Sequence, residues 1–176
     1  MDVVTLKAKI KSKQLSSYLI FSGTEWKVQQ IYIFQIAKVT GKEIKRIDSI
    51  TDIYSQLRNK SFVSKQYIYV VRDDKELMQN EKLQQQISEG LLNNNTLIHI
   101  VTGLDKRTRF YKTYKDTIIE FEALPDAILK KYILKEIQLS DNNVQRLIDI
   151  CEGDFGHILL EIDKLKNYVK YVERHS

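Results

Sequence analysis

The sequence has one cysteine, one proline and no long apolar run, and these scarcities exclude whole classes of protein. A single cysteine, Cys151, cannot form an internal disulfide, so a disulfide-held secreted scaffold is excluded and a reducing compartment is indicated. The apolar runs extend over only a few residues, far short of the roughly 20 that a bilayer requires. The N-terminal segment alternates lysines with single apolar residues, which is not the pattern of a signal peptide. We therefore expect a cytoplasmic protein without a membrane partner.

What is present is the composition of an ordinary globular chain. Its 176 residues are 43% hydrophobic and 29% charged, which excludes a disordered protein. The net charge of +5 is modest, and the cations gather in two clusters. Charge alone favours solvated helix faces, whereas clustered cations also suit phosphate binding. The clusters are Lys7, Lys9, Lys11 and Lys13, and then Lys106, Arg107, Arg109, Lys112 and Lys115.

Short apolar runs alternate with helical periodicity over the first two thirds of the chain. The runs are nearly continuous, which indicates strands covered on both faces, as in a parallel sheet flanked by helices. Thr24 is suited to cap the first helix after the first strand. Strands are predicted at 18–21, 43–47, 67–71, 96–101 and 117–121, and helices at 24–41, 50–57 and 83–91.

The pattern changes at the sole proline, Pro125, after which only helices are predicted. Proline suits the first turn of a helix, and Ser140 or Asp141 can cap the helix that follows. The chain therefore divides into an α/β domain over 1–122 and a linking helix with a partial helical lid over 123–176.

The turn after the first strand lacks the residues that a phosphate loop requires. It reads Phe21-Ser22-Gly23-Thr24-Glu25-Trp26-Lys27, with one glycine and no Gly-Lys-Ser/Thr sequence. Glu25 would repel a phosphate at the start of the helix. Asp73 and Asp74 follow a strand in the manner of a magnesium site, but without a phosphate loop there is no triphosphate for them to serve. We expect neither ATPase activity nor a bound cofactor.

Other catalytic arrangements are absent from the pattern. The histidines His99, His157 and His175 are scattered, and His99 lies inside a predicted strand, which favours a satisfied core residue. Cys151 lies on an apolar helical stripe, which favours a structural thiol. No spacing of ligands suits zinc. The sequence predicts a protein that is not an enzyme.

Four features, taken in order, resemble the delta subunit of bacterial DNA polymerase III, which acts in the clamp loader. They are the apolar strand that ends at Ser22-Gly23, the Ser61-Phe62 step before the next long apolar strand, the Leu104-Asp105-Lys106-Arg107 segment, and Gly153-Asp154-Phe155 followed by Glu161-Ile162-Asp163-Lys164-Leu165. The resemblance covers nearly the whole chain. It implies an AAA+-like domain without a working phosphate loop, followed by a small helical lid domain.

The same resemblance implies a function in DNA replication. Delta subunits bind the DNA sliding clamp, the beta subunit, and open it by inserting exposed apolar residues into a clamp pocket. By position, Phe62 is the main anchor, with Ser61 and Val63 in the neighbouring places. The alternative interpretation is that Phe62 fills the local core before the next strand.

Delta subunits continue into a third, helical domain that assembles with the other loader subunits, and this sequence stops near the middle of the lid. It is either cut from a longer protein or a short relative that recruits, blocks or unloads a clamp. A different class of function is a nucleic-acid-binding module. Its phosphate contacts would come from Lys106, Arg107, Arg109 and Lys112, and its stacking contacts from Phe110, Tyr111 or Tyr114.

Overall fold

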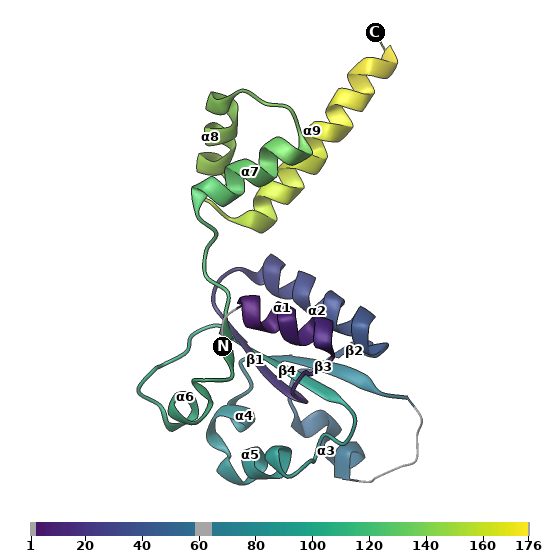
Figure 1. Cartoon of the computed structure of the whole chain (residues 1–176), viewed down its shortest axis with the longest axis vertical. Helices are drawn as coiled ribbons and strands as arrows, with labels where there is room; N and C mark the ends of the chain where they lie inside the picture. The colour runs from purple at the N-terminus through teal and green to yellow at the C-terminus, as the bar shows by residue number, and fades with distance from the viewer. Residues whose placement is uncertain (1–2, 59–64, 176) are drawn as a thin grey trace. The chain divides into compact units, whose positions relative to one another are not determined.

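The structure, a computed structural model, describes residues 3–58 and 65–175, and the chain forms two compact units (Figure 1). The first unit comprises Met1–Gly23 and Gln30–Phe121, and the second comprises Thr24–Gln29 and Glu122–Ser176. The start of the helix after the first strand therefore belongs to the second unit.

One sheet forms the centre of the first unit. Within the described residues its strand order is β2-β3-β4-β1-β5, and every registered pair is parallel. The parallel α/β sheet expected from the sequence is confirmed. The strands are β1 (Tyr18–Ser22), β2 (Glu43–Arg46), β3 (Tyr67–Arg72), β4 (Thr96–Val101) and β5 (Ile118–Glu120).

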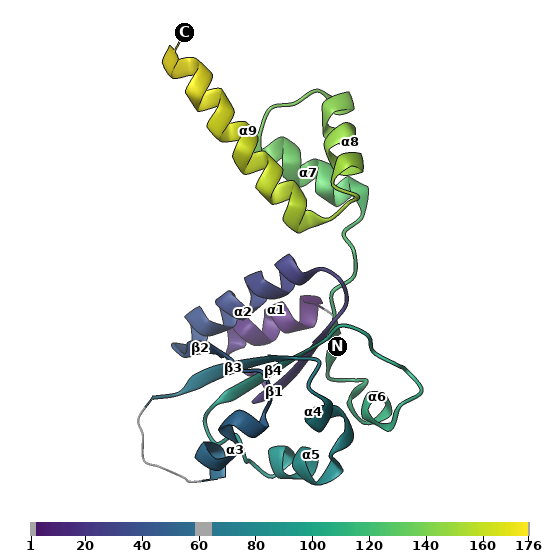
Figure 2. The same cartoon turned by 180° about the vertical axis from the view of Figure 1, so that it is seen from behind.

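Helices cover both faces of this sheet, as Figures 1 and 2 show from opposite sides. One face carries α1 and α2, and the other carries α3, α4, α5 and α6. Because helices cover both faces of the sheet, the side chains on both sides of a strand are buried, which accounts for the nearly continuous apolar runs in the sequence. The helices are α1 (Val3–Ser12), α2 (Trp26–Thr40), α3 (Thr51–Arg58), α4 (Lys75–Gln79), α5 (Glu81–Ser88) and α6 (Arg109–Tyr114).

The two sides of β1 illustrate how the core is divided. Tyr18 and Ile20 belong to the buried cluster that receives α3, α4, α5 and α6. Phe21 points to the opposite face because successive strand residues alternate, and its ring packs on Phe121, which also meets Tyr32 of α2. One strand thus contributes to two apolar layers.

Two short helices were not predicted from the sequence. Asp74 caps α4 by accepting a hydrogen bond from the backbone N–H of Glu76, and Thr108 caps α6 in the same way from Tyr111. Both helices are too short to show a helical period. The expected cap at Thr24 is displaced, since α2 begins at Trp26.

The second unit is built on α7 (Asp126–Glu136), α8 (Asp141–Ile150) and α9 (Phe155–His175). Pro125 immediately precedes α7, and the predicted cap at Ser140 is confirmed by its hydrogen bond from the N–H of Asn143. Cys151 is buried in the core of this unit, and burial raises the pKa of its thiol, as expected for a structural cysteine. The other core side chains are Leu129, Ile133, Val144, Leu147, Ile148, Phe155, Ile158 and Ile162.

Hydropathy along the described helices stays below what a bilayer crossing needs, so none of them qualifies as a membrane span.

Candidate functional site

The segment between α3 and β3 carries the residues expected to grip a clamp. Ser61, Phe62 and Val63 lie outside the described residues, and the structure describes only the two ends of the segment. At one end, α3 finishes at Arg58 with Leu57 buried. At the other end, Lys65 forms an ion pair with Glu43 of 2.5 Å, and both partners are exposed.

Both ends of this segment are tied to one turn, which precedes β4. The side chain of Asn93 donates a hydrogen bond to the carbonyl of Leu57, and the side chain of Asn95 accepts one from the N–H of Tyr67. Both asparagines follow the helix predicted at 83–91, and no contact was predicted for either of them. Asparagine side chains tend to hydrogen-bond backbone groups in turns, and this tendency could have indicated the two contacts from the sequence. The candidate anchor therefore starts and ends at fixed points of the sheet unit.

The turn after β1 is closed where a nucleotide-binding domain would open a phosphate loop. Gly23 has a φ of +100°, and a Cβ placed on it would lie 2.1 Å from the carbonyl oxygen of Phe121. The N–H of Phe121 donates to the carbonyl of Ser22 across 2.8 Å. Backbone from the end of β5 therefore packs directly against this turn.

Glu25 follows this turn and is buried in the second unit. Burial and the nearby carboxylate of Asp154 raise the pKa of Glu25, and a hydrogen bond from the backbone of Leu124 acts in the opposite direction. Its backbone carbonyl accepts from the N–H of Gln29 at the start of α2. A carboxylate in this place suits a helix N-terminus and opposes a phosphate group.

Asp73 and Asp74, the acidic pair that follows β3, are both engaged by protein groups. Asp73 accepts hydrogen bonds from the N–H and the hydroxyl of Thr102, at 2.7 and 2.8 Å. Asp74 is buried and accepts from the N–H of Ile50 at 2.6 Å as well as from Ser49 and the α4 cap. The pair joins the ends of β3 and β4 to the starts of α3 and α4, and in the described part of the chain no three acidic, histidine or cysteine side chains are grouped as a metal site.

His99 is fully buried in β4 and is hydrogen-bonded on both ring nitrogens, so the expectation of a satisfied core histidine is confirmed. Its Nε2 accepts from the N–H of Asp74, and its Nδ1 lies 3.2 Å from the hydroxyl of Tyr18. Burial lowers the pKa of His99 to about 4, although Asp74 and Asp73 act in the opposite direction. The neutral ring serves as a structural link between β1, β3 and β4.

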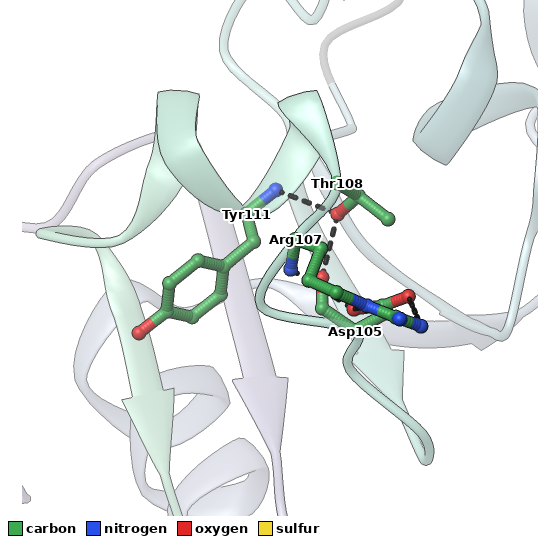
Figure 3. A network of polar contacts seen from close by, with 4 residues as sticks. All are labelled: Asp105, Arg107, Thr108 and Tyr111. Carbon is green, nitrogen blue, oxygen red and sulfur yellow. Dashed lines mark hydrogen bonds and ion pairs between the residues drawn. The ribbon is translucent and has the colours of Figure 1, made fainter.

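The basic segment that follows β4 lies at the start of α6, and much of its charge is locally balanced (Figure 3). Arg107 forms a two-point pair with Asp105, at 3.0 Å from Nε and 2.9 Å from Nη2, and these bonds lower the pKa of Asp105. Arg109 pairs with Glu81, and Lys106 lies 4.0 Å from Glu120. The structure brings the predicted cations together, and three of them face an acid.

The aromatic residues of this segment are less available than the nucleic-acid interpretation required. Phe110 is buried, with its ring against those of His99 and Tyr114, so its expected stacking on bases is wrong. Tyr114 also packs edge-on against Tyr18. Tyr111 is half-buried against the same core cluster. A six-residue helix turns these side chains inward, which the sequence alone did not indicate.

The comparisons with known proteins find similarity in structure and none in sequence. No protein-family model and no curated protein matches the chain. Among solved structures, the fold is similar to the DNA clamp loader delta protein (YqeN) of Bacillus subtilis, with a TM-score of 0.60 and 13% sequence identity. The similarity covers 95% of this chain and 57% of that protein, so the chain spans little more than half of its length. The expected fold class, a parallel α/β sheet flanked by helices and followed by a helical part, is confirmed.

Proposed function

We propose that the chain is a non-catalytic, clamp-loader delta-like module that binds a DNA sliding clamp in the cytoplasm. The observation that carries the proposal is the fold, which is similar over 95% of the chain to a clamp loader delta protein. The order of sequence features gives independent support, because it resembles the same family.

The site chemistry supports a binding role over a catalytic one. The turn after β1 is filled by the backbone of Phe121 and followed by a buried carboxylate at Glu25. Asp73 and Asp74 hold backbone groups. Groups that would bind and hydrolyse a nucleotide triphosphate in a related domain are thus used here to fix the fold.

The grip is assigned to Phe62, with Ser61 and Val63 beside it. An aromatic side chain placed in a pocket can dominate an interface, with quieter neighbours that exclude water. Hydrogen bonds with Asn93 and Asn95 fix both ends of the segment to the sheet unit. A clamp bound to the segment would therefore be held by that unit.

The test is binding of the purified chain to a bacterial sliding clamp at moderate salt without ATP. Phe62→Ala is expected to weaken binding by roughly 30-fold or more, the scale of a hot-spot aromatic. The matched control is Phe34→Ala, which removes an exposed phenylalanine from α2 on the other face of the sheet and should leave clamp binding unchanged. Equal binding by the wild type and Phe62→Ala would move the grip elsewhere, and no binding by the wild type would end the proposal.

A further inference from the structure

The positive charge of the chain is concentrated at its start. The first 42 residues hold seven lysines and two acids, which gives them the whole formal net charge of +5. The remaining 134 residues hold 21 basic and 21 acidic side chains and are neutral as a set. One of the two early acids, Glu25, is buried, so it does little to offset the lysines at the surface.

The fold places most of these lysines on one layer. Both α1 and α2 lie on the same face of the sheet (Figures 1 and 2). Neither α1 nor the part of α2 in the first unit contains an acidic residue. We call the exposed lysines of this layer and its most exposed aromatic ring the α1–α2 surface, defined by Lys7, Lys9, Lys11, Lys13, Phe34 and Lys38.

The lysines of this surface have no acidic partner among the residues that the structure describes. Across residues 3–58 and 65–175, no acidic side chain lies within 4.0 Å of any of the five. The second basic cluster differs, because Lys106, Arg107 and Arg109 each face a carboxylate. Unpaired cations on one face attract a polyanion, and counterion release favours its binding at low salt.

An exposed aromatic ring lies on the same layer as these cations. Phe34 is 57% exposed, and Lys38 is four residues later on α2, so the two side chains project from the same side of the helix. An aromatic ring beside lysines is how proteins hold single-stranded nucleic acids, with bases stacked on the ring and phosphates on the cations. We propose that the α1–α2 surface binds a single-stranded nucleic acid in this way.

Charge complementarity favours this partner over the other candidates. Protein interfaces have few charged residues at their centre and are depleted in lysine, whereas five of the six side chains here are lysines. A membrane surface would require apolar side chains to insert, and the described part of this layer exposes three large ones, Val4, Ile31 and Phe34, against five lysines. Lysines act as point charges without a fixed geometry, which suits a phosphate backbone read without regard to sequence.

The test is fluorescence anisotropy of a labelled 20-nucleotide single strand across a salt series. Lys7→Gln with Lys11→Gln removes two phosphate contacts and should lower the log–log salt slope by about 1.4, which is roughly 25-fold in affinity at 0.1 M salt. Phe34→Leu should weaken binding about tenfold with the slope unchanged, because it removes stacking and no charge. The matched control is Lys112→Gln with Lys115→Gln, which removes the same charge from exposed positions of the other cluster.

Three outcomes would overturn the proposal. The first is no binding of the strand by the wild type at low salt, and the second is an equal or greater loss in the control pair, which would return the site to the second cluster. The third is binding to phosphatidylserine vesicles, but not to the strand, that depends on Lys7 and Lys11. Clamp binding by Lys7→Gln with Lys11→Gln should stay at the wild-type level, so this proposal and the clamp proposal can fail separately.

Discussion

The Nδ1 atom of His99 lies 3.2 Å from the hydroxyl of Tyr18 inside the core of the sheet unit. The other ring nitrogen accepts from the backbone N–H of Asp74. Because Nε2 is an acceptor, the single proton of the neutral ring is on Nδ1 and is donated to Tyr18. A second proton would have to displace the Asp74 bond in a buried site, which agrees with a pKa lowered to about 4.

This relationship predicts a loss of stability in mild acid. The unfolded chain takes up a proton on His99 near pH 6.5 and the folded chain only near pH 4. The contribution of the neutral His99 ring to the unfolding free energy is therefore complete above pH 6.5. It is lost as the pH falls to 4, and the total loss is about 3 kcal/mol. Urea unfolding at pH 7 and pH 4.5 should show it, and His99→Gln should flatten the difference between the two values.

The control for this prediction is His157→Gln, because His157 is exposed at the start of α9. It should keep the pH dependence of the wild type. If His99→Gln kept that dependence as well, carboxylates rather than His99 would be responsible for the acid sensitivity.

The turn at Gly23 is expected to be sensitive to added side-chain volume. In Gly23→Ala the new methyl group would meet the carbonyl of Phe121 at 2.1 Å in a backbone conformation that side chains disfavour. Overpacking and the positive φ together should lower the unfolding free energy by about 3 kcal/mol or more. The chain offers a control in Gly41→Ala, which has a φ of +70° with nothing within 4 Å of the new atom.

Gly41→Ala should cost only the conformational part, about 1 kcal/mol. Urea midpoints of the two variants measure the contrast. Equal losses in the two variants would mean that the turn after β1 has room, and that the closed phosphate-loop position is not a feature of the folded protein.

Local sequence patterns were enough to predict the sheet and most helices, because apolar runs and helix caps depend on residues that are close together in the sequence. The parallel strands, the cap at Ser140 and the core position of His99 all followed from such patterns. Phe110 did not, because its burial depends on β1 and β4, which are distant in sequence. Asp73 and Asp74 had the sequence of a metal site, and only the positions of Thr102 and Ile50 show what these carboxylates bind.

The candidate sites were less predictable than the fold for the same reason. The sequence identified both basic clusters, and the nucleic-acid alternative was placed on the second of them. Pairing of Arg109 with Glu81 joins residues 28 positions apart, and no local period indicates it. The lysines of α1 differ because no acidic side chain of residues 3–58 and 65–175 lies within 4.0 Å of them, and this depends on the arrangement of the whole layer.

The sole tryptophan reports on a contact within the second unit. A Cβ on Gly156, in the first turn of α9, would lie 2.5 Å from the indole ring of Trp26. Gly156→Ala should displace the ring, shift its fluorescence and lower the unfolding free energy by about 1–3 kcal/mol. The control is Gly103→Ala, because nothing lies within 4 Å of a Cβ at that position, and it should leave the emission unchanged. An unshifted spectrum in Gly156→Ala would place Trp26 away from α9.

Millimolar Mg²⁺ and ATP are expected to leave the melting temperature unchanged. The turn after β1 has no phosphate-loop sequence and packs against the backbone of Phe121, and Asp73 and Asp74 accept bonds from protein groups. A nucleotide present at 100 times its dissociation constant would add about 2.7 kcal/mol of stability. Each kcal/mol raises the melting temperature by about 2–4 °C in a chain of this size. A thermal scan would therefore detect such binding as a rise of several degrees. The control is magnesium sulfate at equal ionic strength, because unspecific anion binding to the α1–α2 surface would appear in both scans. A rise with ATP alone, lost in Asp74→Asn, would show that the acidic pair does serve a nucleotide and that the domain is more than a binding module.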